Sequence, residues 1–172
     1  MRFAEELQQA SRLYAALLSS EHEYWDGYGS TAKDNLDTLS RLGLEQYRPM
    51  LLSVLQHFDA AQQKRVLKET VSWSVRGLIS GGIGKGSTEK AYCNAAVNIR
   101  SGAIKNVSQL RTELAPVIAS DLEFREAFRK AKVTKGRAGS AGGCNELCEL
   151  LRWCHKAERL AWPSVEAALY AA

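Results

Sequence analysis

The amino-acid sequence predicts an all-α fold, an irregular multi-helix bundle of about eight helices. Apolar residues recur at helical spacing in segment after segment, and helix-capping patterns precede several of these segments. No segment shows the alternating pattern of a β-strand. With 172 residues, of which 45% are hydrophobic and 24% charged, the chain can bury a substantial core, and global disorder is excluded.

The first three helices are predicted from apolar spacing. Segment 3–19 carries one apolar stripe, and the aromatic, glycine-containing run 24–29 that follows it is typical of a packed loop. A short helix is expected over 34–42. Segment 44–58 contains Pro49, which a first helical turn tolerates.

Capping patterns and glycines delimit the next two helices. The spacing Asp59-x-x-Gln62 indicates a capping box that opens a long helix, and the glycine run 81–84 ends it. A further helix is expected to start at Ser87 or Thr88 and to stop at Gly102.

Two more helices follow the same logic. Asn106-x-x-Gln109 is expected to cap a helix in which Pro116 implies a kink or an early end. Ser120-x-x-Glu123 is a second capping box, and it opens the segment 122–132. The inward face of that segment is expected to consist of Leu122, Phe124 and Phe128.

The C-terminal part of the chain differs in composition. Residues 135–143 are rich in Gly, Ser and Ala, which is typical of a flexible linker. Amphipathic spacing returns after residue 144, and Pro163 fits the first turn of a last short helix. We therefore expect a helical bundle domain over 1–134, a linker over 135–143 and a helical appendage over 144–172.

Charge is distributed unevenly along the chain. The net charge is +4, but residues 61–137 hold 15 basic and 6 acidic residues, a local net charge of +9. Such a segment is a candidate contact for nucleic acid or another phosphate-bearing partner. The competing interpretation is a solvated helix end whose cations favour the negative pole of the helix dipole. The candidate nucleic-acid-binding residues are Lys85, Lys90, Arg125, Arg129, Lys130, Lys132, Lys135 and Arg137.

The four cysteines do not predict a metal site. Cys144, Cys148, Cys154 and His155 lack the C-x2-C pairs of zinc ribbons. A rigid helix also spreads positions 144 and 155 over about 16 Å. We expect all four cysteines, Cys93 included, to be reduced, and Cys144, Cys148 and Cys154 to be buried, with no metal or other cofactor.

No catalytic constellation is found in the sequence. The run 81–88 resembles a phosphate-binding loop, but Gly86 separates Lys85 from Ser87, and a helix rather than a strand precedes it. Trp73 and Arg76 share a helix face, an arrangement that suits base stacking but also a core tryptophan beside a surface arginine, which we favour. We expect no catalytic activity in the chain itself, although a hydrolase whose residues converge only in the fold stays open.

One part of the chain resembles a known family. Residues 39–52, the phrases Val66-Leu67-Lys68 and Val75-Arg76-Gly77-Leu78-Ile79, and the run 121–128 resemble the helical region of GmrSD-like proteins. The resemblance covers about residues 35–132. It implies a role in modification-dependent DNA restriction and defence against phage, in which this helical region stands between a ParB-like domain and an HNH nuclease domain. No residue here matches the ParB-like or HNH motifs, so neither set of catalytic residues carries over.

The leading hypothesis is accordingly a non-catalytic helical module of a DNA-restriction or phage-defence protein. It supports DNA contact through the basic segment, or assembly with other domains or a second copy. The alternative is a protein–protein adaptor or dimerisation domain with no nucleic-acid role. The N-terminal residues are acidic where a signal peptide is apolar, so we expect a cytoplasmic chain without membrane contact.

Overall fold

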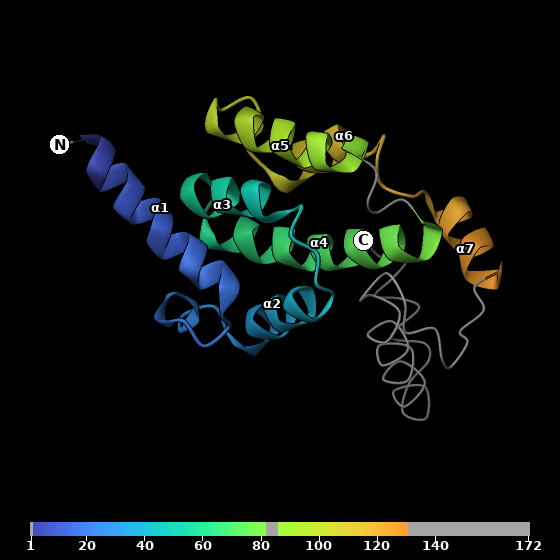
Figure 1. The fold of residues 1–172 in the computed structure, drawn as a ribbon, viewed down its shortest axis with the longest axis horizontal. Coiled ribbons are helices and arrows are strands. Elements are labelled where there is room, and N and C mark those ends of the chain that lie inside the picture. Colours follow the sequence, from blue (N-terminus) through green and yellow to red (C-terminus); the bar gives the residue numbers. More distant parts are fainter. Residues whose placement is uncertain (1, 82–85, 131–172) are drawn as a thin grey trace.

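The computed structural model describes residues 2–81 and 86–130 (Figure 1). Within these residues the chain forms seven α-helices and one 3-10 helix, and no β-strand, which confirms the all-α class. The predicted linker 135–143 and appendage 144–172 lie outside the described residues. The elements are α1 (Arg2–Leu18), η1 (Glu23–Trp25), α2 (Ser30–Arg41), α3 (Arg48–His57), α4 (Ala60–Ser80), α5 (Gly86–Arg100), α6 (Val107–Leu114) and α7 (Asp121–Lys130).

Helices α3 and α4 form the centre of the bundle (Figure 1). Helix α3 packs against α1, α4 and α5, while α2, α6 and α7 pack against α4. Apolar side chains from these helices meet in one core. Its largest fully buried side chains include Trp25, Leu39, Met50, Leu51, Leu67, Ile99, Leu110 and Leu114.

The aromatic run after α1 packs as predicted, around a short 3-10 helix. The indole of Trp25 is fully buried, and its Nε1 donates a hydrogen bond to the Ala16 carbonyl at 2.8 Å. The rings of Tyr24 and Tyr28 meet it edge-on at 5.0 and 5.1 Å between ring centres. His22 Nδ1 accepts from the Tyr24 amide and caps η1. The loop is thus a structural cap on the core.

A buried amide ties this aromatic loop to α3 and α4. Gln63, only 4% exposed, donates from Nε2 to the carbonyls of Phe58 at 2.7 Å and Leu55 at 3.2 Å, at the C-terminal end of α3. Its Oε1 accepts from the hydroxyls of Tyr24, at 3.0 Å, and Tyr28. These bonds satisfy carbonyls that the end of a helix leaves without partners.

The caps predicted from the sequence are present, with changed partners. Asp59 Oδ1 accepts from the Gln62 amide at 2.8 Å, but the Gln62 side chain does not return to Asp59. Gly81, at φ 70°, ends α4 in the left-handed conformation that glycine adopts without strain. Asn106 accepts from the Gln109 amide and caps α6.

Two helix boundaries show how glycine and proline act on the chain. Helix α2 begins at Ser30, not at the predicted Asp34, because it starts after Gly29, whose φ of 82° suits glycine, without a side-chain cap. Helix α6 ends at Leu114, just before Pro116, which confirms the early end expected from that proline.

Replacing Gln63 by alanine tests the role of the buried amide. Gln63→Ala leaves the Leu55 and Phe58 carbonyls without these partners, so we expect the free energy of unfolding to fall by about 2–3 kcal/mol. Urea unfolding measures this change. Gln56→Ala, at an exposed position of α3, serves as the control and should change stability little. Equal stability of the two variants would contradict the assignment.

Two buried tyrosines predict loss of stability in alkali. Burial raises the pKa of Tyr47 from an ordinary value of 10.0 to about 12, although the neighbouring Arg48 partly opposes this shift. Burial also raises the pKa of Tyr92 from 10.0 to about 12. The folded state therefore holds these protons more tightly than the unfolded chain, so stability should fall as pH rises from about 10 to about 12. Urea unfolding at a series of pH values measures this slope.

The double variant Tyr47→Phe/Tyr92→Phe provides the control for the alkaline prediction. It removes both phenols, so its stability should depend less on pH in that window. An unchanged slope would show that other groups cause the alkaline loss.

Candidate nucleic-acid interface

Helix α7 is held against α4 by one arginine. Arg76 Nη1 donates to Asp121 Oδ1 at 2.5 Å and to the Ala119 carbonyl at 3.3 Å. The guanidinium also lies 5.5 Å from the ring centre of Phe124. The Arg76 side chain is only 13% exposed, whereas that of Asp121 is 61% exposed, so a largely buried guanidinium reaches out to a surface carboxylate and fixes the start of α7.

The first turn of α7 uses its carboxylates for structure. Asp121 binds Arg76, as described. Glu123 Oε2 accepts from the Ser120 amide at 2.9 Å and the Ser120 hydroxyl at 2.7 Å, which completes the predicted capping box. The hydrogen bond from the Ser120 backbone amide, more than the one from its hydroxyl, lowers the pKa of Glu123. Of the three acids on α7, only Glu126 has no part in these contacts.

The basic residues of α7 lie beyond this first turn. Arg125, Arg129 and Lys130 are all exposed. Arg129 and Lys130 occupy the last turn, where cations also favour the helix dipole. The exposed charge of the second half of α7 is therefore mainly positive.

Lys90 lies at the same end of the bundle. Helix α5 begins at Gly86, five residues after α4 ends, and Lys90 is exposed in its first turns. Figure 1 shows the C-terminal end of α4, the N-terminal end of α5 and α7 at one end of the molecule. The fold thus brings Lys90 and the α7 cations, distant in sequence, to a common end. We call the exposed side chains of Lys90, Arg125, Arg129 and Lys130 the cationic end.

The other four candidate residues, Lys85, Lys132, Lys135 and Arg137, lie outside the described residues. One expectation about α7 is wrong: Leu122 and Phe128 do not form its inward face, being 68% and 46% exposed. Only Phe124 of the three is partly buried, because the main neighbour of α7 is α4 and a single neighbour covers a narrow face.

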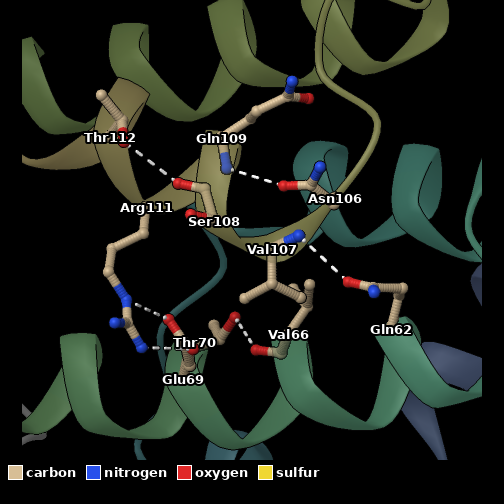
Figure 2. A network of polar contacts seen from close by, with 10 residues as sticks. All are labelled: Gln62, Val66, Glu69, Thr70, Asn106, Val107, Ser108, Gln109, Arg111 and Thr112. Carbon is tan, nitrogen blue, oxygen red and sulfur yellow. Dashed lines mark hydrogen bonds and ion pairs between the residues drawn. The ribbon is translucent and has the colours of Figure 1, made fainter.

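Polar contacts join α4 to α6 (Figure 2). Arg111 donates two hydrogen bonds to Glu69, from Nη2 to Oε1 at 2.7 Å and from Nε to Oε2 at 3.1 Å. These bonds raise the pKa of Arg111. About two turns earlier on α4, Gln62 Oε1 accepts from the Val107 amide at 3.1 Å. Figure 2 shows the two contacts on either side of Val66 and Thr70.

A cavity of about 260 Å³ lies between α4, α6 and α7. Its lining includes Trp73, Arg76 and Arg111, and carboxylates bind both guanidinium groups within it. Trp73 is 7% exposed and belongs to the core, which confirms the core interpretation over base stacking. The cavity's charges thus serve the packing of α6 and α7.

A second cavity, of about 280 Å³, is lined by His57, Arg100 and Lys105 among others. It lies beside the C-terminal ends of α3 and α5, where helix carbonyls point outward and favour cations. The basic lining is therefore accounted for by the helix ends themselves.

Two kinds of side chain in the described part of the chain bear on catalysis: those that could bind a metal ion and those with a shifted pKa. Within them, no three His, Cys, Asp or Glu side chains lie close enough to hold a metal ion. The resolved pKa shifts belong to three tyrosines raised chiefly by burial and to the structural contacts of Arg111 and Glu123. Cys93 is exposed and lies on the side of α5 away from Tyr92, Ala95 and Ile99. The other three cysteines lie outside the described residues.

The structure also shows basic residues that the sequence analysis did not select. Lys64, Arg65 and Lys68 are exposed on α4, and the Lys64 ammonium lies 5.5 Å from the ring centre of Tyr28. These three cations are spaced at i, i+1 and i+4, which places them on one side of a helix. This spacing is the feature of the sequence from which they could have been predicted. They lie in the first half of α4, whereas α7 is attached near its C-terminal end, at Arg76.

Comparison with protein-family models, curated proteins and solved structures yields no match. Over residues 2–81 and 86–130, no helix has both the length and the apolar character needed to cross a bilayer.

Removing the Arg76 side chain tests how α7 is held. Arg76→Ala deletes the contacts to Ala119, Asp121 and Phe124, so the amides of α7 should exchange hydrogen faster, while those in the first half of α4 keep their protection. Hydrogen exchange measured by mass spectrometry resolves the two segments. The matched control is Arg65→Ala on the exposed side of α4, which should leave α7 unchanged; equal effects of the two changes would refute the role of Arg76.

Proposed function

We propose that this chain is a non-catalytic helical module that contacts the phosphate backbone of nucleic acid through the cationic end. Lys85, Lys132, Lys135 and Arg137 stay candidates from the sequence, and they lie outside the described residues. The resemblance of residues 35–132 to the helical region of GmrSD-like proteins supports DNA as the nucleic acid. The same resemblance favours a non-catalytic role in restriction or phage defence, in which other domains cleave the bonds.

The observation that carries the proposal is the division of charge on α7. Two of the three carboxylates on this helix bind Arg76 and the Ser120 cap, while Arg129 and Lys130 are exposed at its far end. The three acids and three bases of α7 balance in number, but Asp121 and Glu123 lie in the first turn and Arg129 and Lys130 in the last, so the far end of the helix presents positive charge to a partner. Exposed arginine and lysine side chains are the groups that most often contact phosphate.

The contact expected from this surface does not depend on base sequence. Helix α7, which carries three of the four residues of the cationic end, contains no Asn or Gln, and phosphate contacts carry no sequence information. Binding should release counterions and weaken steeply with salt. A surface of this kind positions a domain on DNA but leaves sequence choice to another part of the assembly.

Fluorescence anisotropy with a labelled DNA duplex tests the proposal. We expect the full chain to bind two unrelated duplexes with similar affinity, and to lose affinity by orders of magnitude between about 50 and 200 mM salt. Arg125→Ala/Arg129→Ala should weaken binding and reduce the slope of log K against log salt by about 2.

A charge-matched control separates a surface contact from a simple effect of net charge. Arg12→Ala/Arg41→Ala removes the same charge from exposed positions of α1 and α2 and should leave the salt slope nearly unchanged. Equal losses in both double variants would show non-specific attraction. No binding at low salt would overturn the DNA-contacting function and favour the protein–protein adaptor.

A further inference from the structure

Helix α1 lies at the end of the bundle opposite α7 (Figure 1), and it carries an exposed apolar stripe. The stripe consists of Phe3, Leu7, Tyr14 and Leu18, whose side chains are 76%, 58%, 40% and 50% exposed. At 3.6 residues per turn these four positions fall on one side of the helix. The buried side chains Leu13, Ala16 and Leu17 lie on a neighbouring side and face the core.

The residues around the stripe carry no charge. The exposed positions beside it are Ala4, Gln8, Ser11 and Ala15, and all are small or uncharged. The four charged residues of α1, which are Arg2, Glu5, Glu6 and Arg12, lie outside this arc of the helix. A solvated helix face normally carries charged side chains, so an uncharged, exposed arc of this width is typical of a contact surface.

The first half of α1 has no support from the bundle. Every residue from Phe3 to Gln9 is exposed, and the first buried residue of the helix is Leu13. Figure 1 shows this half extending past α3. Isolated helices shorter than about 12–15 residues are marginal in water, so a partner surface along these turns would supply the packing that they lack.

The spacing of the stripe suits pairing with a copy of itself. In an antiparallel pair centred between Ala10 and Ser11, Phe3 meets Leu18 of the other copy and Leu7 meets Tyr14. Ala10 meets Ser11 at the centre, where small side chains allow the helices to approach closely. Antiparallel pairing also places the unsupported first half of each α1 beside the supported second half of the other, and it aligns the helix dipoles favourably.

We propose that the exposed face of α1 is a homodimer interface, in which two copies of this helix pack antiparallel through Phe3, Leu7, Tyr14 and Leu18. The cationic ends then lie at the two far ends of the dimer, and one assembly presents two such surfaces. This interface is independent of nucleic-acid contact. A stable interface of standard size buries about 800 Å² per partner, more than one helix face of about 25 Å supplies, so we expect a weak dimer with a dissociation constant of micromolar order.

Sedimentation equilibrium of the full chain over a range of concentrations tests the proposal. We expect a reversible monomer–dimer equilibrium that Leu7→Glu weakens by at least about tenfold, because the change buries a charge at the interface. The control Gln9→Glu places the same charge on an exposed position of α1 outside the arc and should leave the equilibrium unchanged. A chain that stays monomeric at all concentrations overturns the proposal and points to a different occupant, such as residues 144–172 of the same chain. A dimer that Leu7→Glu does not weaken places the interface elsewhere.

Disulfide trapping tests the register without relying on a destabilised variant. With the four native cysteines replaced by serine, Ala10→Cys should form a covalent dimer under mild oxidation, because the two copies of residue 10 lie about 1.5 Å apart along the axis. In the same background, Gln9→Cys should not form a covalent dimer, because position 9 lies on the opposite side of the helix. Trapping at both positions, or at neither, would rule out the antiparallel register.

Discussion

The fold depends on the burial of one amide, that of Gln63. An apolar residue at this position would fill space, but it would leave the last carbonyls of α3 and two tyrosine hydroxyls without these bonds. Because the amide has both donors and an acceptor, it joins the aromatic loop, the end of α3 and the first turn of α4 at one point. The angle between α3 and α4 follows, and with it the surfaces on which α2, α5, α6 and α7 pack.

Much of the helical architecture was predictable because its signals are local. Asp59, Asn106 and Ser120 each cap the helix that their spacing indicates, since an N-cap interacts with residues only three positions away. The same locality made Pro49 and Pro116 informative. The start of α2 was missed for the corresponding reason: it has no side-chain cap, and only the backbone conformation of Gly29 marks it.

What the sequence could not predict are pairings between distant residues. The positive charge of Arg125, Arg129 and Lys130 is visible in composition, but the attachment of their helix to α4 depends on Arg76, whose partner Asp121 lies 45 residues away. Gln62 fits a capping box, yet its side chain bonds Val107 in another helix. The exposed faces of α1 and α7 were predicted as apolar stripes, and spacing alone does not reveal how much of a stripe its neighbours cover.

The attachment of α7 through Arg76 has a mechanical consequence. The helix meets α4 mainly near its own first turn, so it acts as a lever with its pivot at the Asp121 carboxylate and its charged tip at Lys130. A small rotation at the pivot displaces the tip by a larger distance. Whatever binds the tip therefore exerts torque on α4, and α4 transmits it to the centre of the bundle.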